Sequence, residues 1–469
     1  MENHLRASSM NEPVHVSSIL VKGFKSFKRE QRIELKPLTV LAGANSAGKS
    51  SFFQLLLLLK QTLESDSDPG PLLLNGDSVK FTELSQLFWR PAGGVSAQTM
   101  SIGFVGSDGR VVRQFYDRSP HGALDIHRLE IKTGSLSWLF DVGKLYTIGQ
   151  LPNDVADEIR EGRFGILLQQ ETSAGRSPKF RVARDGGLLW FELQVLGNGT
   201  RGFRGWMPVY LPMRPLADLA TGLLHLPGLR GNPERDYPKR AVGNRFPGAF
   251  QDYVASIIAS WTDKVGQGRL ARLDRWVKRL GLGQAVRVNR INDVAYEVVL
   301  ERRTKRVRNA NPAADSVNIA DVGLGVSQVL PVLVALLTRS VRGRSATAYV
   351  EQPEIHLHPR AQKEMARLMA EEAASGARIV VETHSSVFLL GLQTAIAEGI
   401  IKPDDVALYW FKQDDFGATT AVKAHVDNYG RTAEWPADFD DVLLEAQGQY
   451  IDAVVKASSK SATRDDKSS

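Results

Sequence analysis

Eight residues near the N-terminus, Gly43 to Ser50, read GANSAGKS and match the pattern G-x-x-x-x-G-K-[ST] at every fixed position. The strand-like run "QRIELKPLTVLAG" leads into them, and the helix-like run "SFFQLLLLLKQTL" follows. Glycines in such a loop let backbone N–H groups turn toward a phosphate. In this pattern Lys49 reaches the β- and γ-phosphates and the Ser50 hydroxyl binds Mg²⁺. The sequence therefore predicts a site for a nucleoside triphosphate and Mg²⁺.

Two later strand-like runs end in polar residues that fit the same chemistry. The stretch "ATAYVEQPE" ends a buried strand on Glu351, which would hold Mg²⁺ directly or through water. The stretch "VVETHS" places Thr383 and His384 at the end of another strand, where a side chain can sense the γ-phosphate. The residue after Glu351 is the amide Gln352 rather than a second carboxylate, which raises the question of what activates the attacking water.

The bulk composition is that of an ordinary globular protein and excludes several classes. The chain has 469 residues, which favours two or three structural units over one core. It has no cysteine, so disulfides and thiolate metal sites are excluded, which fits a reducing cytoplasm. The first residues lack the apolar core of a signal peptide, and the apolar runs are too short to span a bilayer. We expect a cytoplasmic protein without membrane partners.

The element pattern predicts an α/β fold, a P-loop NTPase with a large mixed β/α insertion and a small C-terminal subdomain. Alternating strand-like segments dominate the middle of the chain and give way to helical periodicity. Glu351 and His384 are 33 residues apart, the length of one βαβ crossover. The expected division is a disordered segment 1–14, an N-terminal ATPase part 15–90, an inserted β-then-α subdomain 91–310, a C-terminal ATPase part 311–400, a small subdomain 401–455 and a disordered tail 456–469.

Positive charge is concentrated in one part of the chain. The formal net charge is +7, and residues 221–310 hold 18 Lys and Arg against 8 Asp and Glu. Such an excess can bind the phosphate backbone of DNA or RNA, and it can equally be a solvated charged face. The candidate nucleic-acid contacts, in "RLARLDRWVKRL" and "ERRTKRVR", are Arg269, Arg272, Arg275, Arg302, Arg303, Lys305 and Arg306.

The motifs together resemble a known family. "VKGFKSF" followed by "GANSAGKSSF" is similar to the N-terminal half of SMC, RecF and OLD ATPases of the ABC class. "EQPEIHLHP" and "VETHS" resemble their Walker B, D-loop and switch histidine, and "DVGLGVSQVLPVL" stands where their signature stands. "HLPGLRGNPERDYP" and "DNYGRTAEWPADFDD" resemble a subgroup of stand-alone bacterial AAA-type ATPases with a small C-terminal domain of unknown function.

The resemblance implies an ATPase whose two heads hold two ATP molecules between them. Each P-loop would face the signature of the other copy, where Gly325 and Ser327 are the candidate contacts and Gly323 replaces the usual serine. Gln86, in "FTELSQLFW", is the candidate Q-loop glutamine. The candidate nucleotide contacts of the P-loop itself are Gly43, Asn45, Ser46, Ala47, Gly48, Lys49, Ser50 and Ser51.

The resemblance also implies a role for the amide side chain of Gln352. Gln352 stands where the family usually has the glutamate that polarises the attacking water, and an amide is a poor base that can still orient water. We expect slow hydrolysis and a long-lived ATP-bound assembly. Glu354, two residues on, is the alternative base, and His384 completes the candidate catalytic set.

Three functional classes remain open. The first is an ATPase that couples its nucleotide state to nucleic-acid or partner sensing, in anti-phage defence beside a separate effector protein or in RecF-type DNA maintenance. The second is an OLD-type nuclease, which the 85 residues after His384 are too few to support. The third is a transporter ATPase, against which the SMC-like N-terminus and the long insertion argue.

Overall fold

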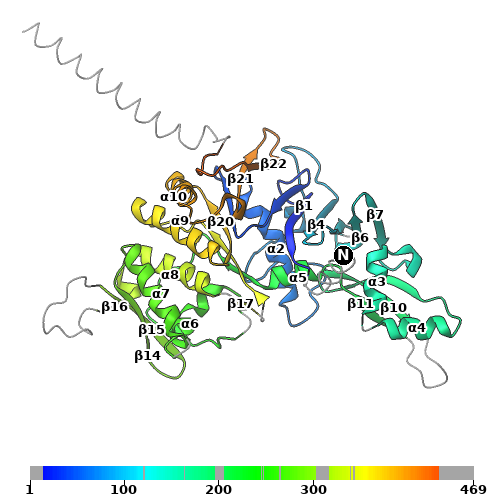
Figure 1. Cartoon of the computed structure of the whole chain (residues 1–469), viewed down its shortest axis with the longest axis horizontal. Helices are drawn as coiled ribbons and strands as arrows, with labels where there is room; N and C mark the ends of the chain where they lie inside the picture. The colour runs from blue at the N-terminus through cyan, green and yellow to red at the C-terminus, as the bar shows by residue number, and fades with distance from the viewer. Residues whose placement is uncertain are drawn as a thin grey trace, which may run out of the picture.

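The computed structural model describes residues 14–119, 122–162, 164–195, 205–243, 246, 248–263, 266–302, 316–338, 340–341 and 344–432. Two segments that the sequence predicts to be disordered, 1–14 and 456–469, lie outside these residues, except for residue 14. The C-terminal subdomain beyond residue 432 also lies outside them. The described elements form an elongated molecule, with a central α/β layer between an all-β arm and a mixed module of helices and short strands (Figure 1).

The central layer is a six-stranded sheet in the order β12-β19-β20-β3-β21-β22. The first five of these strands run parallel, and only β22 runs antiparallel, beside β21. β3 is buried along its whole length, which explains its continuous apolar run. The strand bounds are β3 Leu38–Gly43, β12 Leu223–Leu226, β19 Thr347–Glu351, β20 Arg378–Thr383, β21 Val406–Gln413 and β22 Thr419–Ala424.

Helices cover both faces of this sheet, as parallel sheets require. One face packs against α2 and α5 in a core that includes Leu41, Tyr349 and Val380. The opposite face packs against α8, α9 and α10 in a second core that includes Val40 and Val381. The helix bounds are α2 Lys49–Leu63, α5 Arg214–Thr221, α8 Leu324–Leu337, α9 Pro359–Ala374 and α10 Ser386–Ala397. The prediction of an α/β P-loop NTPase fold is confirmed.

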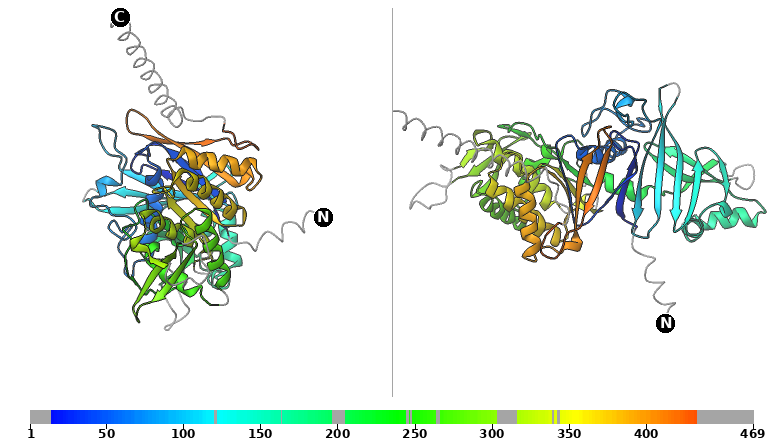
Figure 2. Two further views of the ribbon diagram at one scale, coloured as in Figure 1. Left: turned by 90° about the vertical axis from the view of Figure 1, so that its left-hand side faces the viewer. Right: turned by 90° about the horizontal axis from the view of Figure 1, so that it is seen from above.

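The all-β arm is built on two antiparallel sheets (Figure 2). The larger sheet has the strand order β2-β1-β4-β5-β6-β7, and the smaller sheet has the order β11-β10-β9-β8. In the sequence, the helices α3 and α4 lie between β8 and β9 of the smaller sheet. The bounds are β1 Val16–Lys22, β2 Gln31–Glu34, β4 Thr99–Gly106, β5 Val111–Arg118, β6 Leu124–Thr133, β7 Leu136–Asp141, β8 Leu145–Thr147, α3 Asn153–Glu161, α4 Gly165–Ser173, β9 Lys179–Asp185, β10 Leu188–Val195 and β11 Gly205–Tyr210.

The mixed module packs its helices on a small antiparallel sheet and on α8. In Figure 1 it lies at the end of the molecule opposite the all-β arm. Its bounds are β13 Tyr237–Pro238, α6 Val254–Ser260, α7 Gln267–Arg279, β14 Ala285–Arg290, β15 Ala295–Glu301 and β16 Ser316–Asn318, and a two-stranded ribbon follows, β17 Ser340–Val341 and β18 Arg344–Ser345. Short 3₁₀ turns are η1 Leu84–Gln86, η2 Ile148–Gln150, η3 Phe250–Tyr253, η5 Ile319–Asp321 and η6 Pro403–Asp405.

The structure divides the middle of the chain differently from the single 91–310 insertion that the sequence suggests. β4 lies beyond residue 91 but pairs with β1, so the sheet that starts before the P-loop continues through this boundary. β12 then returns to the central sheet and pairs in parallel with β19. Strand partners far apart in the sequence leave no local signal, which is why turn composition alone placed the boundary elsewhere.

Helices α9 and α10 approach each other closely at Gly391. A Cβ atom at Gly391 would lie 2.8 Å from the carbonyl oxygen of Lys363 and 3.0 Å from the Cβ atom of Ala366, both on α9. The absent side chain therefore permits the close packing of the two helices that follow β19 and β20.

We expect Gly391→Ala to lower the free energy of unfolding by about 1–3 kcal/mol because the added methyl group overpacks the α9–α10 contact. Gly268→Ala is the matched control, since a Cβ atom at this glycine of α7 meets nothing within 4 Å, and alanine has the higher helix propensity. Urea denaturation of both variants measures the difference. Equal stability of the two variants would contradict the close-packing account.

Candidate functional site

The loop Gly43–Ser50, the P-loop, joins β3 to α2 in a conformation that its sequence permits. Ser46 and Gly48 adopt positive φ angles of 62° and 93°. A Cβ atom at Gly48 would lie 2.7 Å from Thr419 Oγ1 and 2.8 Å from Ser26 Oγ, so glycine is required by space as well as by backbone angle. The loop opens onto a cavity of about 530 Å³, lined by Lys25, Ser26, Asn45, Ser46, Gly48, Lys49, Ser50, Ser51, Gln352 and His384.

Lys49 is held at the floor of this P-loop cavity by backbone oxygens. Its ammonium group donates hydrogen bonds to Gly43 O at 3.0 Å and Ala44 O at 2.7 Å, and lies 3.4 Å from His384 Nδ1. Burial lowers the pKa of Lys49 to about 8, against the opposing charges of Glu382 and Glu354. Burial and the charge of Lys49 lower the pKa of His384. The structure thus brings together P-loop lysine and switch histidine, far apart in the sequence.

Ser50 contacts a carboxylate that the sequence interpretation did not single out. Its hydroxyl donates a 2.6 Å hydrogen bond to Glu382 Oε2, and the Tyr349 hydroxyl donates to Glu382 Oε1. Burial, with the negative charge of Glu351 beside it, raises the pKa of Glu382 to about 8. Glu382 is the residue before Thr383 in "VVETHS", and an acid inside an otherwise apolar strand was the available signal.

Glu351, the expected Mg²⁺ residue, ends β19 with both carboxylate oxygens already in contact with other groups. Glu351 Oε1 lies 2.9 Å from His225 Nε2, and Glu351 Oε2 accepts a 3.2 Å hydrogen bond from the N–H of Gly228. Burial opposes ionisation of Glu351, but the contacts with His225 and Gly228 and the charge of Arg230 lower its pKa below the ordinary value. The described residues place no hydrogen bond between Glu351 and Ser50.

Oxygen atoms at this end of the sheet suit Mg²⁺, which prefers a few protein oxygens together with phosphate and water. Ser50, Glu351 and Glu382 supply a hydroxyl and two carboxylates. In the part of the chain that the structure describes, no three His, Asp or Glu side chains cluster as a ligand set of their own. The residues present therefore fit an ion that nucleotide phosphates help to bind.

Gln352 and Glu354 lie on different sides of the loop that follows β19. Gln352 has a positive φ of 47°, donates its N–H to Glu382 O at 2.8 Å and lines the P-loop cavity. Glu354 is buried, and its Oε1 atom accepts hydrogen bonds from Thr383 Oγ1 at 2.8 Å and His384 N at 3.0 Å. Burial raises the pKa of Glu354. Glu354 thus orients the switch loop and does not line the cavity.

A buried arginine joins β19 to α8. Arg230 donates to Glu351 O at 2.5 Å and to Gln328 O at 3.2 Å, and Gln328 returns a hydrogen bond to Gly231 O at 2.6 Å. Burial lowers the pKa of Arg230 to about 10. Arg230 lies in the stretch "HLPGLRGNPERDYP", which the sequence singled out only as a family marker.

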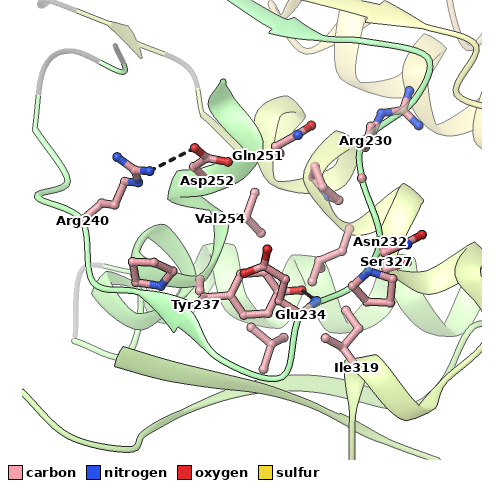
Figure 3. Close-up of a pocket in the computed structure, with 17 residues that line it drawn as sticks. Arg230, Asn232, Glu234, Tyr237, Arg240, Gln251, Asp252, Val254, Ile319 and Ser327 are labelled. Atoms are coloured by element: carbon pink, nitrogen blue, oxygen red, sulfur yellow. Dashed lines mark hydrogen bonds and ion pairs between the residues drawn. The ribbon is translucent and has the colours of Figure 1, made fainter. Parts of the chain in front are cut away.

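The candidate signature residues lie at the start of α8, away from this chain's own P-loop cavity. Gly325 faces His356 O, and Ser327 Oγ donates to Leu324 O at 3.0 Å. Ser327 also lines a second cavity of about 300 Å³ between α8 and the mixed module, where Arg240 and Asp252 form an ion pair at 3.1 Å (Figure 3).

Gln86, the candidate Q-loop glutamine, lies away from the P-loop cavity, whereas Lys25, to which the sequence analysis gave no role, lines it. Gln86 is exposed and its amide contacts Thr82 in its own turn, so it does not line the P-loop cavity. Lys25 does line the cavity, and its ammonium group donates to Gln54 Oε1 at 2.6 Å beside the ring of Phe81. The "VKGFKSF" motif was the signal for Lys25.

The structure describes four of the seven candidate nucleic-acid residues. Arg269 and Arg275 on α7 are exposed. Arg272 forms an ion pair with Glu372 of α9, and Arg302 donates to Asp321 O at 3.3 Å. These contacts give Arg272 and Arg302 intramolecular roles. Arg303, Lys305 and Arg306 lie outside the described residues.

Comparisons with known proteins agree with this geometry. Residues 194–390 match the family model "AAA domain, putative AbiEii toxin, Type IV TA system", and residues 15–95 match "AAA ATPase domain". The chain carries an AAA-type ATPase domain. Residues 401–443 match "Protein of unknown function (DUF3696)", in agreement with the expected C-terminal domain. The prediction of an AAA-type ATPase with such a domain is confirmed. No curated protein matches the chain in sequence.

Solved SMC heads resemble this AAA-type ATPase over most of its length. An SMC head bound to the C-terminal winged-helix domain of ScpA is 14% identical, with 88% of this chain and 98% of that chain covered and a TM-score of 0.46. The SMC head from Thermotoga maritima is 11% identical, with 87% and 98% covered and a TM-score of 0.40. A Pyrococcus yayanosii SMC head is 9% identical, with 93% and 100% covered and a TM-score of 0.42.

Among the helices that the structure describes, none combines the length and the apolar character needed to cross a bilayer.

We expect stability without nucleotide to fall as pH rises from 5 to 7.5 and to fall less steeply in Glu382→Gln. The folded-state pKa of Glu382, about 8, exceeds its unfolded value, so the folded chain binds the extra proton in this range. The unfolding free energy then decreases by up to about 1.4 kcal/mol per pH unit from this group. Urea denaturation across this range measures the slope.

Glu161→Gln, on the exposed surface of α3, is the control for loss of a carboxylate and should keep the wild-type slope. If Glu382→Gln keeps that slope as well, Glu382 is not the protonated group.

Proposed function

We propose that the chain binds Mg–ATP in the P-loop cavity and hydrolyses it slowly. The observation that carries the proposal is the cavity itself, in which Lys49, Ser50, Gln352 and His384 face one space at the ends of β3, β19 and β20. Lys49 and the P-loop N–H groups would bind the β- and γ-phosphates, and Lys25 adds a second cation. Mg²⁺ held beside Ser50 would neutralise phosphate charge.

The geometry supports Gln352 as the residue that orients the attacking water. Gln352 lines the cavity from the loop after β19, as Asn45 does from the P-loop, whereas Glu354 accepts the Thr383 and His384 donors. An amide orients water but cannot take its proton, so hydrolysis lacks a strong base and proceeds slowly. Glu354 acts through the switch loop, as a positioning residue that holds His384 beside Lys49.

We expect Gln352→Glu to raise the turnover number at least about tenfold because a carboxylate in this position can act as a general base. Gln352→Ala should lower the turnover number, which should stay below the wild-type value at every pH tested. Single-turnover and steady-state release of phosphate, with and without DNA, measure the change. A turnover number in Gln352→Glu at or below wild type, with ATP affinity intact, would refute the assignment of the water-orienting residue.

We further propose that two chains associate head to head around ATP. At the start of α8, Leu324 is 42% exposed although it is apolar, whereas Gly325 is partly buried and lies against His356 O. A helix N-terminus favours negative charge, so the α8 N-terminus of one copy suits the γ-phosphate held by the other. Ser327 would add a hydroxyl near this contact.

We expect Leu324→Asp to remain monomeric under conditions in which wild type dimerises with Mg–ATPγS. The helix dipole stabilises an acidic side chain at the start of α8, so this substitution should not unfold the chain. The added negative charge repels the phosphate bound to the partner copy. Leu324→Asn is the matched control, because asparagine has nearly the same shape as aspartate but no charge. This variant should dimerise. Sedimentation velocity at several protein concentrations measures the association. Dimerisation of Leu324→Asp as tight as that of Leu324→Asn would argue against this interface.

The proposed biological use is the control of a separate effector by the nucleotide state, in anti-phage defence. The matched family description, which names an AbiEii toxin of a type IV toxin–antitoxin system, supports this setting. Exposed Arg269 and Arg275 support nonspecific nucleic-acid contact as the sensed signal. A RecF-type maintenance role would use the same cycle and the same contacts.

A further inference from the structure

The carboxylates of Glu351 and Glu382 stand side by side on adjacent strands. β19 and β20 pair in parallel with Glu351 opposite Glu382, and Glu382 is in turn opposite Leu41 of β3. Neighbouring residues of paired strands point to the same face of the sheet, which here is the face covered by α2. Glu382 therefore lies between Glu351 and the helix that begins at the P-loop lysine.

The Ser50 hydroxyl and the Glu382 carboxylate lie close enough together to share one metal ion. Mg²⁺ binds oxygen ligands at about 2.0–2.1 Å in octahedral geometry, so two adjacent ligands lie about 2.9 Å apart. Ser50 Oγ and Glu382 Oε2 are 2.6 Å apart. An ion that binds the Ser50 hydroxyl from the P-loop cavity meets the Glu382 carboxylate with little rearrangement of either side chain.

Glu351 makes its contacts with groups other than Ser50. His225 and Gly228 contact its two oxygens, and Arg230 holds its backbone carbonyl. The ring of His225 also stacks on Tyr349 with centroids 5.2 Å apart, which fixes the histidine beside the carboxylate. Movement of Glu351 toward Ser50 would leave the partly buried His225 ring and the Gly228 N–H group without these acceptors, which costs stability.

Glu382 is oriented toward Ser50 by its own packing. The Tyr349 hydroxyl donates to Glu382 Oε1 and leaves Oε2 directed at the serine. Tyr349 is in turn stacked on Phe53 of α2, with ring centroids 4.6 Å apart. Glu382 is only 2% exposed, and a divalent cation beside Oε2 would offset the cost of burying the charged carboxylate.

We propose that Glu382, rather than Glu351, is the carboxylate that holds Mg²⁺ beside Ser50, and that Glu351 positions the strand end from its contacts with His225 and Gly228. The inference rests on the proposed binding of Mg–ATP and names the ligand residue of that same site. It moves the acidic metal residue from β19 to β20, the strand next to the P-loop strand.

The test is isothermal titration of the nucleotide-free chain with ATPγS, in Mg²⁺ and in EDTA, so that binding is measured without turnover. The ratio of the two dissociation constants is the Mg²⁺ enhancement. We expect Glu382→Gln to reduce this enhancement by about tenfold or more, with metal-free binding retained. Glu351→Gln is the matched variant and should keep the enhancement within about threefold of wild type.

Loss of the enhancement in Glu351→Gln with retention in Glu382→Gln would overturn the assignment, as would an equal loss or no loss in both variants. If Glu382→Gln shows no cooperative unfolding transition, Glu382→Asp and Glu351→Asp replace the pair, and the larger loss is expected at position 382. A wild-type chain that binds no ATPγS in either buffer refutes the proposed function itself, whereas wild-type binding with unaltered variants refutes only the role of Glu382.

Discussion

The position of β20 between β3 and β19 is the constraint on which the candidate site depends. Because the three strands are parallel, their carboxyl ends meet at one edge of the sheet and bring together residues that are hundreds of positions apart. Lys49 starts the helix after β3, Glu351 ends β19, and His384 follows β20. The arrangement also places Glu382 between the other two strands, where its carboxylate accepts a hydrogen bond from Ser50.

The second organising contact is the buried arginine between β19 and α8. Arg230 is bound to the Glu351 carbonyl on one side and to Gln328 on the other, so the end of β19 and the first turns of α8 share one side chain. A phosphate that binds the α8 N-terminus from another copy would act on an element already tied to the end of β19. The geometry thus offers a direct route from head-to-head contact to the residues that face the bound nucleotide.

The sequence predicted the parts of the site that local patterns encode. The P-loop, the α/β class, the strands that end at Glu351 and His384 and the ATPase family all follow from short motifs and their order. The role of Glu382 required knowledge of which strand lies beside β3, and strand order has no local signature. The contacts of Arg272 with Glu372 and of Gln86 with Thr82 likewise depend on tertiary packing, which makes a charged or amide side chain structural in one setting and functional in another.

The close helix pair that Gly391 permits has a mechanical consequence for the nucleotide cycle. The loop with Gln352 and Glu354 runs into α9, and the loop that starts at His384 runs into α10, so each loop is anchored to one member of a tightly packed pair. Glu354 bridges the two loops at their other end. The two loops are therefore joined at both ends, and a displacement of His384 by a bound γ-phosphate would reach Gln352 through Glu354 and the α9–α10 contact.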